Sequence, residues 1–64
     1  MDKISIIIRN RNEETYIGFA LQSICDHLPD AEVIVLDNNS TDESMNIVHM
    51  FKKVNLMVVV VMQI

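Results

Sequence analysis

The sequence predicts an α/β fold in which parallel strands alternate with helices, and three observations support this prediction. Residues 4–8, 32–36 and 56–62 are short runs dominated by Ile, Val and Leu, with the length and β-branching of buried strands. The two segments between these runs carry apolar residues at helical spacing. Right-handed crossovers make such strands parallel and place the helices against the sheet. We therefore expect one domain of order β-α-β-α-β.

The central strand, residues 32–36, ends abruptly in Asp37. Its unalternated apolar pattern is typical of a strand covered on both faces. Small polar residues follow and suit a turn. Ser40, with Glu43 three residues later, has the spacing of a capping box, so a helix is expected over residues 41–53. A carboxylate at the carboxyl end of a parallel strand, before a helix, lies where open α/β sheets bind ligands.

The first strand, residues 4–8, leads into a polar loop over residues 9–12. Asn12 is a candidate N-cap for a helix over residues 13–27. Two glutamates follow Asn12, and carboxylates in a first helical turn interact favourably with the helix dipole. The sequence thus places a second polar loop beside the turn that follows Asp37.

Composition limits the classes of protein to consider. Sixty-four residues make one small domain, and the net charge of −4 argues against nucleic acid or an anionic membrane as partner. Cys25 is the single cysteine, so no internal disulfide can form. No secretory signal is recognisable, and the longest apolar run is too short to span a bilayer as a helix. We expect a cytoplasmic location.

Several other kinds of site are not supported. Gly18 is the only glycine, which excludes a glycine-rich phosphate loop. The two histidines have no Cys or His neighbours at metal-ligand spacing. Asp37 could instead be a phospho-acceptor of the receiver-domain type. That alternative needs acidic residues after the first strand, where Arg9 and Arg11 stand.

Two blocks of the sequence match a known family. Residues 4–14 (ISIIIRNRNEE), with Leu-Gln-Ser-Ile at residues 21–24, form the first block, and residues 32–44 (EVIVLDNNSTDES) form the second. Together they resemble the opening of family-2 glycosyltransferases of the GT-A fold. The resemblance implies part of a three-layer, Rossmann-like domain. It also implies a nucleotide-diphosphosugar donor (UDP- or GDP-linked) whose sugar is transferred to a saccharide or other acceptor, as in polysaccharide biosynthesis.

The resemblance also implies a donor-nucleotide site in the loops at the carboxyl ends of the first two strands. The residues that it points to are Arg9, Arg11, Asn12, Glu14, Asp37 and Asn38. Carboxylates and amides can bond base edges and ribose hydroxyls, and arginines can stack on a base or pair with phosphate. Structural roles stay open for the same residues, as caps, turn formers or solvated loop residues. No catalytic residue is assigned.

Other features depart from the family pattern. The Asp-x-Asp motif, which binds Mn²⁺ or Mg²⁺ in full-length members, does not occur in the sequence, and no counterpart of the catalytic carboxylate is recognisable. We therefore expect residues 1–64 to be a partial, N-terminal donor-binding domain, inactive alone. The alternatives are a non-catalytic nucleotide-sugar-binding module and a self-associating structural fragment. An open sheet edge beside residues 4–8 and the valine run at 58–61 favour self-association.

Overall fold

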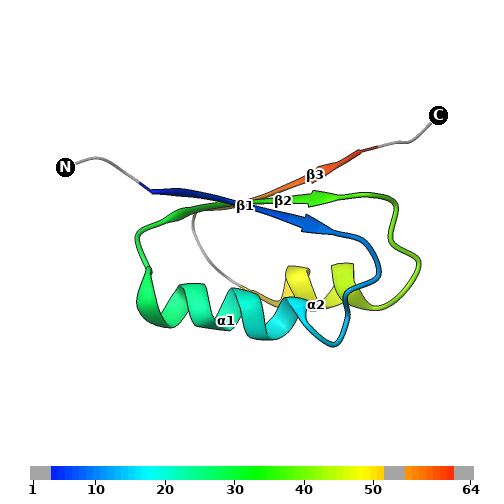
Figure 1. Ribbon diagram of the computed structural model, residues 1–64, viewed down its shortest axis with the longest axis horizontal. Helices are drawn as coiled ribbons and strands as arrows, with labels where there is room; N and C mark the ends of the chain where they lie inside the picture. Colours follow the sequence, from blue (N-terminus) through cyan, green and yellow to red (C-terminus); the bar gives the residue numbers. More distant parts are fainter. Residues whose placement is uncertain (1–3, 52–54, 62–64) are drawn as a thin grey trace.

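The computed structural model describes residues 4–51 and 55–61, and its elements follow the expected order (Figure 1). They are β1 (Ser5–Asn10), α1 (Ile17–His27), β2 (Glu32–Asp37), α2 (Ser44–Met50) and β3 (Leu56–Val60). The strands form one sheet in the order β1-β2-β3, and both strand pairs are parallel. The α/β class and the β-α-β-α-β order are thus confirmed.

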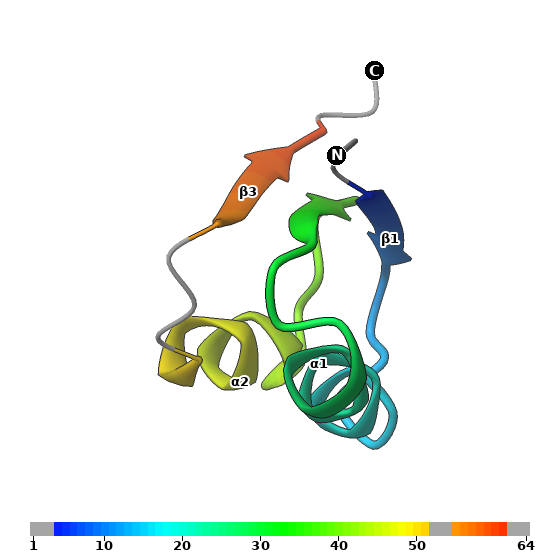
Figure 2. The ribbon, with the colours of Figure 1, turned by 90° about the vertical axis from the view of Figure 1, so that its left-hand side faces the viewer.

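Both helices lie side by side on one face of the sheet (Figures 1 and 2). The described residues therefore build two layers, and the third layer of the expected arrangement is not among them. The handedness of the crossover connections explains why both helices lie on one face. From β1 to β2 to β3 the chain crosses the sheet in one direction, and right-handed crossovers made in one direction place their helices on the same face.

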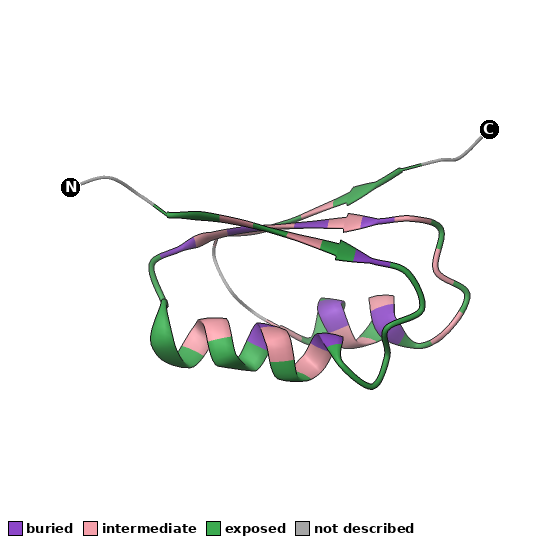
Figure 3. Ribbon diagram, viewed as in Figure 1, coloured by how far each residue is buried: buried purple, intermediate pink, exposed green. Residues whose placement is uncertain are grey.

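The core lies between β2 and the helices (Figure 3). Its buried members are Ile17, Leu21, Val33, Val35 and Val48. Val33 and Val35 alternate along β2 with residues that face away from the helices, because successive side chains of a strand point to opposite faces. The central strand thus supplies the two side chains around which both helices pack.

The face of the sheet opposite the helices is open. Ile7, Ile34 and Met57 are aligned across the three strands by the pairing register. Ile7 is 61% exposed and Met57 is 54% exposed, while Ile34 is half-buried. The prediction that the central strand is covered on both faces is therefore wrong for the described residues, because no helix crosses to that side.

Two strand boundaries differ from prediction. β1 was expected over residues 4–8 but continues to Asn10, because Arg9 and Asn10 pair with Leu36 and Asp37 of β2. β3 was expected over residues 56–62 and ends at Val60, with residue 62 outside the described part. Pairing with a neighbouring strand thus extends β1 into residues that look like loop in the sequence.

The first helix starts later than expected, at Ile17 instead of residue 13. The Glu13 carbonyl accepts hydrogen bonds from Tyr16 N at 2.9 Å and Ile17 N at 2.8 Å, so a separate turn precedes the helix. Asn12 has a φ of 53°, in the left-handed region, whereas an N-cap residue takes extended angles. Its expected role as N-cap of this helix is therefore wrong.

The second helix is also shorter than expected, beginning at Ser44 instead of residue 41 and ending at Met50. Ser40 does not cap it, because its hydroxyl is bonded to Asp37. The Glu43 carboxylate accepts a bond from Asn46 Nδ2, so the predicted capping box is not formed. Residues 52–53 of the predicted helix lie outside the described ranges.

We expect Val35→Ala to lower the free energy of unfolding by about 2–3 kcal/mol, since two buried methyl groups are lost and a cavity is left. Val35 is 0% exposed. Val59→Ala is the matched control, because Val59 is a strand valine that is 38% exposed. Urea unfolding of both variants measures the difference. Equal destabilisation would show that the core is not centred on β2.

Candidate functional site

The carboxyl ends of β1 and β2 bring two polar loops together. Asn10 is the last residue of β1, and the parallel register pairs it with Asp37, the last residue of β2. The β1–α1 loop (residues 11–16) and the β2–α2 loop (residues 38–43) therefore leave the sheet side by side (Figure 1). The site predicted from sequence falls within this region.

Asn10 lies at the centre of a buried hydrogen-bond network. Its side-chain Nδ2 is 2.9 Å from Asp37 Oδ1, 3.0 Å from Ser44 Oγ and 3.2 Å from Ser40 Oγ. Ser40 also donates to Asp37, through its hydroxyl to Oδ1 at 2.5 Å and its N–H to Oδ2 at 3.2 Å. The amide of Asn10 thus joins the end of β2, the following loop and the first residue of α2.

Asn12, in the β1–α1 loop, also links the two loops. Its Oδ1 accepts hydrogen bonds from the backbone N–H of Thr41 at 2.7 Å and of Asp42 at 3.2 Å. Its own N–H donates to Ser40 Oγ at 3.0 Å. The Asn12 side chain therefore satisfies backbone donors just ahead of α2 and not those of its own helix.

A carboxylate makes a further link between the loops. Asp42 Oδ2 accepts a bond from the N–H of Glu14 at 3.1 Å, and its Oδ1 accepts from the N–H of Ser44 at 2.9 Å. Asn39, like Asn12, has a positive φ, of 54°. Asn tolerates the left-handed conformation better than most residues, which suits turns that contain no glycine.

The hydrogen bonds favour the ionised form of two carboxyl groups. Burial opposes ionisation of Asp37, but the bonds from Ser40 and Asn10 outweigh it and hold the pKa of Asp37 below its ordinary value. Desolvation likewise opposes ionisation of Asp42, and the bonds from Ser44 and the Glu14 N–H lower its pKa. Both groups are therefore carboxylates at neutral pH and act as fixed acceptors.

A hollow of about 490 Å³, which we call the strand-end pocket, opens beside these loops. It is lined by Arg9, Asn10, Arg11, Glu13, Leu36, Asn38 and Val61. The side-chain Oδ1 of Asn38 is buried and has no hydrogen-bond partner among the residues that the structure describes. The lining thus brings together two arginines, one glutamate and two asparagines. Arginine side chains can pair with an anionic ligand, and amide and carboxylate groups can bond the donors that it carries.

The residues predicted from sequence fall into two groups. Arg9, Arg11 and Asn38 line the strand-end pocket. The other three, Asn12, Glu14 and Asp37, take part in the hydrogen bonds that join the loops. Asp37 is 3% exposed, with both carboxylate oxygens engaged by Asn10 and Ser40.

The sequence placed Asn10 only within the polar loop over residues 9–12, left open whether Glu13 faces the site, and did not point to Leu36 or Val61. Asn10 could have been found from the alternation of β1, because residues 6 and 8 face the helices and residue 10 continues this face. A polar residue at such a position needs a partner. A predicted strand that ends at residue 8 leaves residue 10 outside this alternation.

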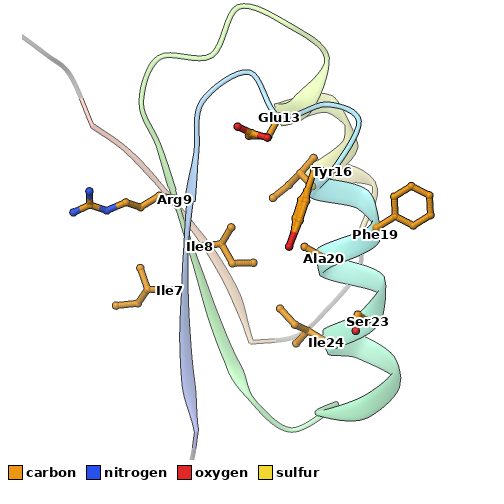
Figure 4. A pocket seen from close by; sticks show the side chains of 10 residues that line it. Ile7, Ile8, Arg9, Glu13, Tyr16, Phe19, Ala20, Ser23 and Ile24 are labelled. Atoms are coloured by element: carbon orange, nitrogen blue, oxygen red, sulfur yellow. The ribbon is translucent and has the colours of Figure 1, made fainter.

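A second hollow, of about 590 Å³, lies between the outer edge of β1 and α1 (Figure 4). Ile8, Ala20 and Ile24 point into it, while Ile7, Arg9 and Phe19 point away. Its lining is mostly apolar, and it lies where a further strand or side chain could pack beside β1. We regard it as part of the open edge and not as the ligand site.

Neither a metal-ligand cluster nor a membrane-spanning helix is present in the part of the chain that the structure describes. Within residues 4–51 and 55–61, no three or more His, Cys, Asp or Glu side chains are grouped so as to hold a metal ion. In the same part of the chain, no helix combines the length and apolar character needed to cross a membrane.

The lowered pKa values predict how stability depends on pH. In the folded protein the pKa values of Asp37 and Asp42 lie below their ordinary value of 3.8, so the folded state binds these protons less tightly than the unfolded state does. Their stabilisation is therefore complete above that value and is lost as the pH falls through the lowered values. The urea midpoint should stay level from about pH 7 to pH 5 and fall below about pH 4.

Asp37→Asn should lower the free energy of unfolding at pH 7 by about 1–3 kcal/mol, because buried donors lose their acceptor. The further loss of stability in acid should be smaller than in the unsubstituted protein. Asp26→Asn, at an exposed position of α1, is the control. If Asp37→Asn and the unsubstituted protein lose stability identically in acid, the linkage to Asp37 is wrong.

Comparison with known proteins relates the chain to a family of enzymes. No curated protein and no solved structure matches it. The sequence model described as glycosyl transferase family 2 matches residues 5–63, which is nearly the whole chain and includes both loops of the site. With the parallel β-α-β-α-β order already established, this match shows that the chain belongs to glycosyltransferase family 2.

Proposed function

We propose that this chain is the donor-nucleotide half of a glycosyltransferase and binds the nucleoside diphosphate of a UDP- or GDP-sugar in the strand-end pocket. The observation that carries the proposal is the lining of that pocket by Arg9, Arg11 and Asn38 at the carboxyl ends of β1 and β2. Open α/β sheets bind ligands at this edge. Family membership makes a nucleotide sugar the class of ligand to test first.

The chemistry of the lining suits the two ends of such a donor. A guanidinium group can pair with a diphosphate or stack on a base. The Oδ1 of Asn38 is buried and lacks a hydrogen-bond partner among the described residues, and a rotation of this side chain toward the pocket would let it accept a hydrogen bond from an N–H of a base or from a ribose hydroxyl. Arg9 and Arg11 flank the end of β1 in sequence and Asn38 follows β2, so a bound nucleotide would bridge the two loops.

The transfer step itself needs groups beyond this pocket. The strand-end pocket holds no nucleophile paired with a base, and we assign it binding and not bond breaking. In a full-length protein we propose that the sugar passes to a saccharide or another acceptor, with a divalent metal (Mn²⁺ or Mg²⁺) held by residues other than those described. The free, half-buried thiol of Cys25 is compatible with our proposal of a cytoplasmic location.

A titration with UDP, GDP and their sugar conjugates, followed by backbone amide NMR with and without Mg²⁺, tests the binding proposal. We expect saturable shifts at Arg9, Arg11 and Asn38, present without the metal. Asn38→Ala should weaken binding about tenfold, the loss of one hydrogen bond in a buried setting.

Asn46→Ala is the matched control for this substitution, because Asn46 is an exposed amide on α2 outside the pocket. Shifts that avoid both loops, or equal effects of the two substitutions, would refute the proposal. The same samples should release no nucleoside diphosphate from the sugar conjugates. Turnover would show that the chain carries a complete catalytic site.

A self-associating role is the second candidate, and the open edge of β1 favours it. The carbonyls of Ile4 and Asn10 accept bonds from Glu32 N and Asn38 N of the β2 side. In a parallel ladder alternate residues bond to the same neighbour, so Ser5, Ile7 and Arg9 turn their backbone groups to the open side. An unpaired edge of this kind is a template for another strand.

Sedimentation at increasing concentration tests association through this edge. We expect a rising average mass, reversed by Ile7→Lys, because a charged side chain disfavours pairing at a sheet edge. Met50→Lys, a similar change at an exposed position of α2, is the control. A strictly monomeric protein at several hundred micromolar would exclude this role.

A further inference from the structure

We propose that Asn10 is a positioning residue of the donor site, which holds Asp37 and Asn38 in place from the neighbouring strand. This inference rests on the function proposed above, because it concerns the wall of the same pocket. It assigns a role to a residue that belongs to the pocket lining but is only 1% exposed, and so has little surface of its own to offer a ligand.

The first step of the argument is that Asn10 holds two consecutive residues in two ways. Its side-chain Nδ2 donates to Asp37 Oδ1 at 2.9 Å, and its backbone carbonyl accepts from Asn38 N at 2.9 Å. The side chain of Asn38 then enters the lining of the strand-end pocket. The placement of Asn38 thus depends on the backbone carbonyl of Asn10 directly and on its side chain through Asp37.

The second step is that the buried side-chain amide of Asn10 destabilises the folded state. The Oδ1 of Asn10 is buried without a hydrogen-bond partner among residues 4–51 and 55–61, which is unfavourable for folding. A leucine has the same branched shape and the same number of side-chain heavy atoms, and it would itself carry no unsatisfied polar atom next to Met45, whose sulfur lies 3.8 Å from Nδ2. Packing alone therefore does not account for an amide at this position.

The third step is that the amide reaches the end of β2, the β2–α2 loop and the start of α2. Besides Asp37, its Nδ2 is within hydrogen-bond distance of Ser40 Oγ at 3.2 Å and Ser44 Oγ at 3.0 Å. Ser40 in turn accepts from Asn12 N, so the connection continues into the β1–α1 loop. Two amide hydrogens thus couple the end of β2, the start of α2 and both loops.

Asn10→Leu tests the proposal by removing the donor while it keeps the branched shape of the side chain. We expect the carboxyl pKa of Asp37, followed by NMR, to rise toward its ordinary value, and the Asn38 amide signal to shift. The dissociation constant for UDP should rise at least tenfold. Asn46→Leu, the same change on the exposed face of α2, should leave all three quantities as they are.

Asn10→Asp gives a readout that a merely structural role would not produce. At neutral pH its carboxylate repels Asp37 and binding should be weak. As the pH falls, a single proton shared by the two carboxyl groups restores a donor between them, so affinity should recover, while the unsubstituted protein shows no such gain. If Asn10→Leu does not fold, this pH profile decides the question.

The outcomes separate the two proposals. If the unsubstituted chain does not bind UDP or GDP, the proposed function fails, and the Asp37 pKa and the Asn38 amide signal still decide whether Asn10 positions them. If Asn10→Leu leaves both quantities unchanged, or weakens binding without moving the Asp37 pKa, the positioning role is refuted.

Discussion

The hydrogen bond between the Asn10 amide and the Asp37 carboxylate connects the ends of two parallel strands, and the polar half of the molecule is built on it. It exists because the register of the sheet places these residues opposite each other. In a parallel pair the carboxyl ends meet at one edge, so both loops must leave from the same place. A shift of one residue would turn Asn10 to the open face and break the network.

The loops at this edge are ordered by side chains and not by regular secondary structure. The N-cap residues of the two helices, Tyr16 and Glu43, make no side-chain cap hydrogen bond. Asn12, Ser40 and Asp42 instead bond backbone groups across the gap between the loops. The walls of the strand-end pocket are therefore set by contacts between residues about 28 positions apart, which makes the site a property of the folded sheet.

The two faces of the sheet contrast strongly. One face buries Val33 and Val35 under the helices, and the other leaves Ile7 and Met57 open. This asymmetry follows from chirality, since two right-handed crossovers in one direction cannot cover both faces. A domain of this size has little surface to bury, so the open face and the β1 edge are the places where further protein surface would add most stability.

The sequence by itself determined the α/β class, the order of the elements and the loops in which the site lies. Those features depend on apolar periodicity and on turn residues, which are local. Strand ends, helix starts and the role of each polar residue were decided by tertiary structure. Asn12 and Ser40 look like helix caps in sequence, but they bond to groups that only the fold brings near. Asn10 looks like loop until β2 pairs with it, because register joins residues that are distant along the chain.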